Sequence, residues 1–326
     1  MVHRIPSGTR DVLPDEMREL RAMTDRVREV FEKAGYGEVY TPALEYEATF
    51  EQGDSSATGP AYRIFDERGE VLVLRSDMTV PIARLVATRY EHAEPPFRFA
   101  YLAHAYRGVR PQRGQSRELL QAGIELIGAA APDGTVEALT VLCQALDAAG
   151  LKTYRVGLGD ASLYPALLET VGVDGSRRDL ILAELVRGDF VGVERELEEV
   201  AIGATERELL LRVPRTRGGP EVLETLPEPL EQATSGMRAV HEQLEPSVAD
   251  RVIFDLGLVR MLGYYTGAVF QVYDPAYGVP IGSGGRYDEL LGGFGRPLPA
   301  VGFALNVERL HIALTGEEQG RRGGTR

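Results

Sequence analysis

The sequence is poor in cysteine, in long apolar runs and in net positive charge, and each shortage excludes a class of protein. The chain has 326 residues and a single cysteine, Cys143, so it cannot form an internal disulfide. No run of about 18 apolar residues is present to span a bilayer, and the first residues lack the apolar core of a secretory signal. We therefore expect a cytoplasmic protein without a membrane span. The 36 Lys and Arg against 49 Asp and Glu give a net charge of -13, which argues mildly against a phosphate-backbone binder.

The rest of the composition is that of an ordinary globular protein. Hydrophobic residues make up 44% of the chain and charged residues 26%, which excludes wholesale disorder and collagen-like repeats. A chain of this length buries roughly three-quarters of its unfolded surface, so we expect a sizeable core in one large domain or two ordinary ones.

Several motifs of catalysis and cofactor binding are missing. The histidines show no metal-ligand spacing and a lone cysteine does not favour a zinc site, so we expect no metal. The glycine-rich segment at 282–285 lacks the lysine of a P-loop and does not fit the dinucleotide pattern, so we expect no cofactor. No G-x-S-x-G motif or Cys and His pairing indicates a hydrolase.

Hydrophobic periodicity indicates an α+β fold, an antiparallel sheet flanked by helices. Apolar residues recur at helical spacing over 15–34, and a second helix is expected at 135–149. A glycine-rich turn is expected at 282–295, before a strand that runs into a helix from 300 onwards. Further strands, mostly sequential antiparallel neighbours, are expected at 38–40, 62–66, 71–75, 97–107, 119–127, 153–158, 251–256 and 264–273.

The domain organisation follows from two changes in composition. Residues 165–248 are rich in Glu, Arg and Leu at helical spacing without a convincing strand, which indicates a small helical insert. The tail, 317–326, is expected to be disordered. The main domain is therefore expected to cover 1–316.

A first group of polar residues follows the strand expected at 71–75. Arg75 and Asp77 lie two residues apart, so their side chains lean to one face, and Thr79 extends the set. A surface ion pair in a loop would explain Arg75 and Asp77 equally well.

A second group surrounds a basic loop, 107–117. Beyond this loop, Gln121, Gly123 and Glu125 share one strand face by the period of two, and Gly123 leaves a hollow for a small ligand. A carboxylate and an amide over a glycine suit an ammonium group. A solvated hairpin tip would explain the loop arginines alone, because charge runs usually face water, but it does not explain Gln121 and Glu125.

A third group combines Arg260 with the tyrosine pair Tyr264 and Tyr265, and the glycines at 282–285 lie close to Arg286. Backbone approaches a ligand closely only where side chains are absent, and tyrosines offer a flat apolar wall with a polar tip. Glycine-rich segments are weak indicators by themselves.

Four segments together resemble the catalytic domain of class II aminoacyl-tRNA synthetases, and within that class the histidyl-tRNA synthetase family, along nearly the whole chain. These segments are GTRDVLPDE, TPALE, YRGVRPQRG and PAVGFALNVERL. TPALE, with Pro42 and Glu45, resembles motif 1, which packs the dimer interface of the family. The resemblance places Arg107 at the motif 2 arginine that grips the ATP α-phosphate. It places Arg309 at the motif 3 arginine beside the γ-phosphate.

The same resemblance implies a histidine-binding pocket. Asp77 and Glu125 would neutralise the α-ammonium group, Arg260 would pair with the carboxylate, and Tyr264 and Tyr265 would close on the imidazole. The full implied set is Asp77, Thr79, Arg107, Gln121, Glu125, Arg260, Tyr264 and Tyr265.

Three departures from the synthetase pattern argue against aminoacylation. Val109 stands where motif 2 carries a glutamate that helps to hold adenine, and Gly263 stands where the family has the aspartate of G-L-D-Y-Y. The chain also ends 17 residues after Arg309, so no anticodon-binding domain is expected. We therefore expect no tRNA partner, and Arg107 and Arg309 are interpreted as vestigial nucleotide-binding residues.

This combination resembles the family of regulatory subunits of ATP phosphoribosyltransferase, as do the segments LRSDMT and LVRGDFVGVERELEEV. The resemblance implies a non-catalytic protein that partners a short-form catalytic subunit in the first step of histidine biosynthesis, with histidine as feedback effector. It also implies a homodimer within a hetero-oligomer, for which we expect a hetero-octamer. Two alternatives stay open: a truncated synthetase-like ligase that activates histidine with ATP, and a histidine sensor with an unrelated partner.

Overall fold

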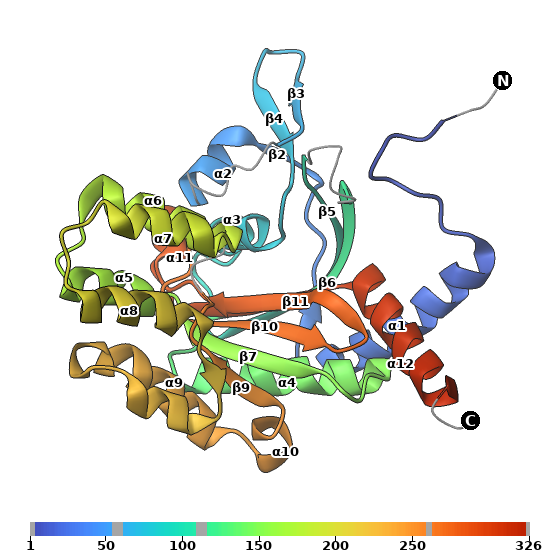
Figure 1. The fold of residues 1–326 in the computed structure, drawn as a ribbon. Coiled ribbons are helices and arrows are strands. Elements are labelled where there is room, and N and C mark those ends of the chain that lie inside the picture. Colours follow the sequence, from blue (N-terminus) through green and yellow to red (C-terminus); the bar gives the residue numbers. More distant parts are fainter. Residues whose placement is uncertain (1–3, 54–60, 109–115, 259–262, 324–326) are drawn as a thin grey trace.

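The chain folds around a nine-stranded sheet with helices packed against it (Figure 1). The computed structural model describes residues 4–53, 61–108, 116–258 and 263–323. The strand order is β1-β5-β6-β12-β11-β10-β7-β9-β8. Neighbours from β5 to β7 are antiparallel, whereas β1 pairs with β5 and β7 with β9 in parallel. The predicted antiparallel sheet flanked by helices is confirmed, and the described residues include no separate anticodon-binding domain.

The strands of this sheet are β1 (Gly37–Glu38), β5 (Phe97–Tyr106), β6 (Glu118–Ile127), β7 (Arg155–Asp160), β8 (Arg217–Gly218), β9 (Val252–Asp255), β10 (Ala268–Asp274), β11 (Tyr277–Arg286) and β12 (Ala300–Asn306). A smaller sheet, in the order β2-β4-β3, projects from the body (Figure 1) and consists of β2 (Leu44–Tyr46), β3 (Arg63–Phe65) and β4 (Val71–Leu74).

Two long helices bury apolar stripes against the main sheet. Helix α1 (Pro14–Lys33) begins with proline and two acidic residues, which suit a helix N-terminus, and it buries Leu20, Met23, Val27 and Phe31. Helix α4 (Asp133–Ala149) ends at Gly150, whose φ of 117° favours glycine. The C-terminal helix α12 (Val307–Gly323) follows β12 directly. These apolar faces share one core with the sheet.

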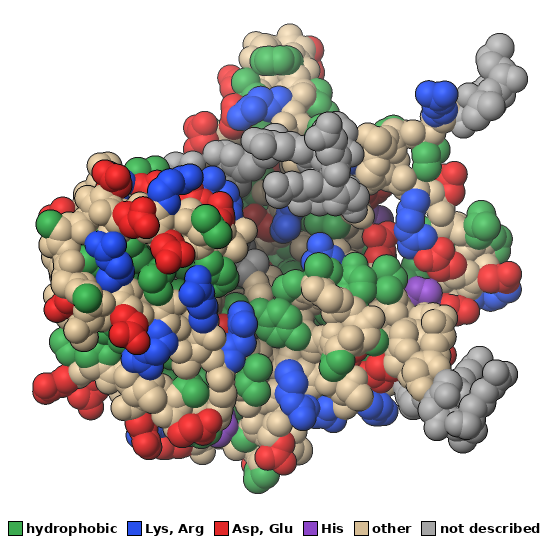
Figure 2. Space-filling view, in the orientation of Figure 1, with side chains coloured by type: hydrophobic (Ala, Val, Ile, Leu, Met, Phe, Trp, Pro, Cys, Tyr) green, Lys and Arg blue, Asp and Glu red, His purple; other side chains and the backbone are tan. Residues whose placement is uncertain are grey.

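The region predicted as an insert consists mainly of helices, as its periodicity indicated. They are α5 (Leu163–Thr170), α6 (Gly175–Arg187), α7 (Phe190–Glu198), α8 (Ala204–Arg212), α9 (Glu231–Gln243) and α10 (Pro246–Ala249). Their buried side chains, such as Ile181 and Leu197, belong to the same core as the main sheet. Over α6 to α8 acidic and basic side chains alternate (Figure 2), which is typical of a solvated surface.

Four expectations about local structure were wrong. The glycine-rich segment 282–285 is not a turn but part of strand β11 in the middle of the sheet, because its glycines accommodate neighbouring side chains. Residues 264–267 precede strand β10 rather than belonging to it. The predicted insert contains the short strand β8. The tail is helical to Gly323, since Glu317 accepts hydrogen bonds from the backbone of Lys152 and Thr153.

Three elements were not anticipated: β2, helix α2 (Glu47–Gly53) and helix α3 (Thr79–Arg89). Helix α3 carries Pro81 and several β-branched residues, which weaken the helical signal of the sequence. None of the helices within the described ranges combines the length and the apolar character that a membrane span requires.

Candidate functional site

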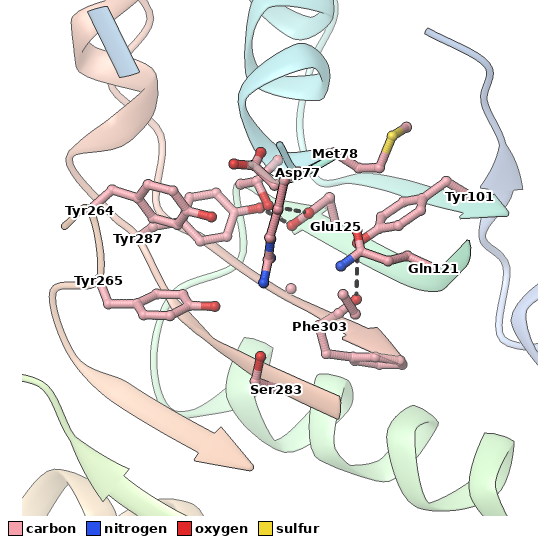
Figure 3. A pocket seen from close by; sticks show the side chains of 14 residues that line it. Asp77, Met78, Tyr101, Gln121, Glu125, Tyr264, Tyr265, Ser283, Tyr287 and Phe303 are labelled. Atoms are coloured by element: carbon pink, nitrogen blue, oxygen red, sulfur yellow. Dashed lines mark hydrogen bonds between the residues drawn. The ribbon is translucent and has the colours of Figure 1, made fainter. Parts of the chain in front are cut away.

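A pocket lies over the face of the sheet formed by β5, β6, β12 and β11 (Figure 3). It encloses about 390 Å³ of space, counted with its opening to solvent. Its 14 lining residues are Asp77, Met78, Thr79, Tyr101, Arg107, Gln121, Glu125, Tyr264, Tyr265, Ser283, Tyr287, Gly302, Phe303 and Ala304.

Seven of the eight residues predicted for histidine binding line this one pocket. They come from the start of α3 and the link before it, from the residue after β5, from β6, and from the segment before β10, which are far apart in sequence. Arg260 lies outside the described residues. Arg309 does not line the pocket but donates from Nη1 to the carbonyl oxygen of Pro280 at 2.8 Å. The predicted residues therefore make up half of the pocket lining.

Glu125 is the most enclosed polar group of the pocket. Its side chain is 1% exposed, and Thr79 Oγ1 donates to Oε1 at 2.7 Å while the Tyr287 hydroxyl donates to Oε2. Burial raises the pKa of Glu125 to about 8, an effect that the two hydroxyl donors oppose and the nearby Asp77 reinforces. A carboxyl group with this pKa is mostly protonated at neutral pH while the pocket is empty.

Asp77 and Arg75 do not form the surface ion pair that we considered. Arg75 is 3% exposed and donates to the carbonyl oxygens of Thr41 at 2.5 Å and His104 at 2.8 Å. Asp77 is 7% exposed and its Oδ1 accepts from the backbone of Val80 at 3.1 Å, in the first turn of α3. Arg75 therefore ties the smaller sheet to β5, while Asp77 remains a pocket residue.

Gln121 presents an unused acceptor to the pocket. The side chain is 7% exposed, and Oε1 is buried without a hydrogen-bond partner within the described part of the chain. An unmet buried acceptor costs about 1–3 kcal/mol, so a ligand N–H that reaches it would gain this amount.

The hollow expected over Gly123 is not empty. Gly123 lies opposite Tyr101 across β5 and β6, and a Cβ at Gly123 would lie 2.5 Å from the Tyr101 hydroxyl oxygen. The glycine therefore makes room for the Tyr101 ring, whose hydroxyl donates to the Phe303 carbonyl at 3.3 Å. The ligand space lies beside Tyr101, toward Glu125 and Ser283 (Figure 3).

Tyrosine rings form one wall of the pocket. The ring centroids of Tyr264 and Tyr265 lie 5.2 Å apart, and those of Tyr264 and Tyr287 lie 5.7 Å apart, both edge to face. Burial raises the pKa of all three phenols, so they stay neutral and cannot add negative charge. Such a wall suits a flat ring or a cation.

Glycines of the central strands make space for the pocket side chains. A Cβ at Gly285 would lie 2.9 Å from the Tyr265 ring, and one at Gly302 would lie 1.9 Å from Glu125 Oε2. Arg286, noted beside the glycines, is 3% exposed and bonds to Asp288 Oδ1 at 2.7 Å and to the Ala129 carbonyl at 3.1 Å. These glycines therefore act through packing, and Arg286 supports the fold.

Half of the lining residues were not predicted from the sequence. Tyr101, Ser283 and Tyr287 are the most informative omissions, because each presents a hydroxyl group to the pocket wall. Tyr101 pairs with Gly123 across β5 and β6, a register that the sequence does not show. Tyr287 gave no sequence signal either, because its contact with Glu125 joins residues 162 positions apart. The remaining missed residues are Met78, Gly302, Phe303 and Ala304.

The chemistry of the pocket favours an amine over a metal or a phosphate. No group of three or more metal-ligating side chains occurs among the residues that the structure describes. Two buried carboxyl groups oppose an anion, and the exposed Arg107 lies at the pocket margin with Nε 3.5 Å from the Ser76 carbonyl oxygen. A ligand with an ammonium group meets the acids, and its N–H groups can reach Gln121.

Comparison with known proteins agrees with this geometry. Residues 8–310 match the family described as histidyl-tRNA synthetase. The chain is 38% identical over 317 residues to the ATP phosphoribosyltransferase regulatory subunit of Moorella thermoacetica, covering 95% of this chain and 82% of that protein. It is 39% identical over 330 residues to the regulatory subunit of Symbiobacterium thermophilum, covering 97% and 81%. These names favour the regulatory interpretation over the ligase.

Solved structures confirm that the fold is of the class II synthetase type. An ATP phosphoribosyltransferase regulatory subunit/histidyl-tRNA synthetase from Bacillus halodurans superposes with a TM-score of 0.87 at 33% identity, covering 96% of this chain and 84% of that one. A histidine–tRNA ligase subunit from Alicyclobacillus acidocaldarius gives 0.83 at 32% identity, with 98% and 99% covered. The chain belongs to the histidyl-tRNA synthetase-like family of ATP phosphoribosyltransferase regulatory subunits.

Proposed function

We propose that this chain is a non-catalytic regulatory subunit that binds histidine and controls a short-form catalytic subunit of ATP phosphoribosyltransferase. The partner transfers the phosphoribosyl group of 5-phosphoribosyl diphosphate to ATP, the first step of histidine biosynthesis. This chain is required for full activity and for feedback inhibition. We also propose that the complex is cytoplasmic, because such a pathway draws on ATP and free amino acids.

One observation carries the proposal: two buried carboxyl groups and an amide oxygen without a hydrogen-bond partner among the described residues face a small pocket walled by tyrosines. Asp77 and Glu125 neutralise the ammonium group of histidine, and Gln121 Oε1 accepts one of its N–H bonds. Tyr264 and Tyr265 close on the imidazole ring. Arg260, outside the described residues, is the proposed partner of the carboxylate.

The absence of catalysis in this chain is supported by its nucleotide-binding positions. Val109 replaces the glutamate that contacts adenine in synthetases, and Gly263 replaces an aspartate of the histidine-specific segment. Arg309 is engaged with the Pro280 carbonyl oxygen, away from the pocket lining. The chemistry therefore belongs to the partner subunit, and this chain needs no tRNA.

Histidine inhibits only if it binds the active and inactive assemblies with different affinity. A coupling free energy of about 1–3 kcal/mol between effector and activity is typical of such regulation. The pocket is lined by the start of α3, by β5 and by β6, and Arg75, two residues before Asp77, joins the smaller sheet to β5. A ligand held by both Asp77 and Glu125 would therefore lie beside the connection between the two sheets.

The assembly proposed here is a homodimer within a hetero-octamer. The outer face of the smaller sheet is apolar and exposed, with Leu44 42% exposed, Tyr46 53% and Ile64 44%. The register of β2, β4 and β3 brings these residues to one face together with Leu72 and Leu74. An exposed apolar sheet face of this kind suits a second copy of the chain, because the motif 1 segment contributes β2.

Two assays test the proposal together. Adding the purified chain to a short catalytic subunit should raise phosphoribosyl-ATP synthesis, and histidine should then inhibit that synthesis. Histidine-dependent exchange of pyrophosphate into ATP by the chain alone should be absent. Robust exchange would instead establish the ligase, and no effect on the catalytic subunit would leave a histidine sensor with another partner.

Glu125 offers a direct test of the ligand position. Glu125→Gln keeps the shape but removes the charge that faces the ammonium group, so histidine binding should weaken by about 1.5–3 kcal/mol in calorimetry. Glu118→Gln, which changes an exposed residue on the same strand, is the matched control and should bind normally. Unchanged binding in the Glu125 variant would place the ligand elsewhere.

A further inference from the structure

Asp77 and Thr79 reach the pocket from the start of helix α3 (Figure 3). Asp77 is attached to this helix, because its Oδ1 accepts from the backbone N–H of Val80 at 3.1 Å. Thr79 is the first residue of the helix and donates to Glu125 Oε1 at 2.7 Å. The position of α3 therefore sets the position of both side chains and of their contact with the main sheet.

An ion pair between Arg84 and Glu45 joins α3 to strand β2 of the smaller sheet. Arg84 Nη2 lies 2.7 Å from Glu45 Oε1, and Nε lies 2.9 Å from Oε2, so the guanidinium group holds both carboxylate oxygens. Glu45 is 6% exposed, so water and salt screen the pair little. Alternation along β2 turns Glu45 inward while Leu44 and Tyr46 are exposed. The pair is thus a buried contact on the inner side of the strand.

The short segment 41–45 also holds the other end of the stretch that supplies the pocket residues. The backbone N–H of Arg75 donates to the carbonyl oxygen of Ala43 at 2.9 Å, and the Arg75 side chain donates to that of Thr41 at 2.5 Å. Residues 75–84 are therefore attached to this segment at both ends, and the pocket residues lie between the two attachments.

Apolar packing alone fixes α3 less closely than the ion pair does. The helix buries Val80, Ile82, Ala83 and Val86 in a core of apolar neighbours. Hydrophobic contacts are non-directional, so they resist separation of the helix more strongly than a small slide or rotation. A guanidinium–carboxylate pair with two bonds adds geometric specificity. Side chains that recognise a small ligand need such support, because they must be held within about 0.5 Å.

From these contacts we infer that Glu45 and Arg84 form a positioning pair for the histidine pocket, although neither of them lines it. The inference rests on the proposed function, since the ligand concerned is histidine. The pair holds α3 so that Asp77 and the Thr79–Glu125 contact meet the ammonium group together. Loss of the pair lowers the affinity for histidine in a chain that is otherwise folded.

A double-mutant cycle on histidine affinity tests the inference. In titration calorimetry, Glu45→Gln and Arg84→Gln should each bind histidine about tenfold more weakly than the wild type, which is within the usual range for interacting residues. The variant with both substitutions should be no weaker than either single variant, because all three lose the same contact. Arg84→Lys should also lose affinity, since it keeps the charge beside Glu45 but not the paired geometry. It covers the case in which an unpaired Glu45 prevents folding.

The control is an ion pair of the same geometry on the other face of the main sheet. Arg98 of β5 donates to Glu137 of α4 from Nε at 2.7 Å and from Nη2 at 2.8 Å, and neither residue lines the pocket. Glu137→Gln should therefore lower the free energy of unfolding and leave histidine affinity unchanged. Circular dichroism verifies that each variant is folded under the conditions of the titration.

Wild-type affinity in folded Glu45→Gln and Arg84→Lys variants would overturn the inference. Losses that add in the double variant would also overturn it, since the two residues would then act separately. An equal loss in Glu137→Gln would do the same, because the effect would then follow from stability and not from the position of α3. Failure of histidine to bind the wild type at all would instead contradict the proposed function.

Discussion

Gly302 of β12 stands directly opposite Glu125 of β6, and a Cβ at Gly302 would lie 1.9 Å from Glu125 Oε2. The carboxyl group therefore occupies the space that a side chain at residue 302 would fill. Because Glu125 is also held by Thr79 and Tyr287, it cannot move aside without losing a hydrogen bond. The shape of the pocket depends on the absence of one methyl group.

We predict that Gly302→Ala destabilises the fold by about 1–3 kcal/mol, the usual cost of overpacking, and weakens histidine binding at least tenfold. Denaturant unfolding and calorimetry measure the two effects. The control is Gly236→Ala, since Gly236 lies in α9 and no neighbouring atom lies within 4 Å of the position that its added methyl group would take. The Gly236→Ala variant should bind histidine normally, and its helix α9 should be slightly more stable. Normal binding in Gly302→Ala would show that Glu125 is not held as described.

Removal of the Tyr287 hydroxyl should shift the acidity of the pocket. The Tyr287 hydrogen bond favours ionised Glu125, so Tyr287→Phe raises the pKa of Glu125 above about 8. Histidine affinity at neutral pH should fall about tenfold, and the pH at which affinity levels off should move upward. Measuring the histidine affinity of Tyr287→Phe and of the wild type across a pH series tests the fall in affinity and the shift in its pH dependence. An unchanged profile with reduced affinity would indicate a loss of packing rather than of acidity.

Glu125 should also make the unfolding free energy depend on pH. Its pKa rises from its usual 4.5 to about 8 on folding, so the native state binds more protons than the unfolded state between these values. The stabilising contribution is therefore complete at acid pH and is lost as the pH rises toward 8. The free energy of unfolding of the wild type, minus that of Glu125→Gln, should fall by about 1 kcal/mol per pH unit in this window. A flat difference would mean that Glu125 is already ionised in the empty pocket.

The sequence predicted which residues of a single strand face the pocket, but it did not predict the contacts that separate strands make there. Gln121 and Glu125 were predictable because a strand places alternate residues on one face, and this rule is local. Tyr287 and Gly302 were not, because they reach Glu125 through the register of separate strands. The hollow assigned to Gly123 was misplaced for the same reason, since the sequence does not show that Tyr101 lies across from it.

Secondary structure followed the same pattern. The helix over 15–34 was predictable from a strong apolar stripe and clear end signals. The glycine-rich end of β11 was interpreted as part of a turn because glycine clusters usually mark turns, whereas these glycines admit the rings of Tyr265 and Phe270. Local propensity cannot reveal such a tertiary requirement.

The proposed homodimer depends on the outer face of the smaller sheet, and Tyr46 and Ile64 are its most exposed central members. Both lie beside Leu72 in the register of β2, β4 and β3, so a charge at either position would be buried against apolar groups of the second copy. We predict that Tyr46→Asp combined with Ile64→Asp shifts the chain from dimer to monomer in sedimentation experiments, because burying an unpaired charge costs several kcal/mol. Val191→Asp, at a 77% exposed position on α7, should leave the dimer intact. A dimer that survives the double substitution with unchanged affinity would exclude this face as the interface, and circular dichroism would verify that the fold is retained.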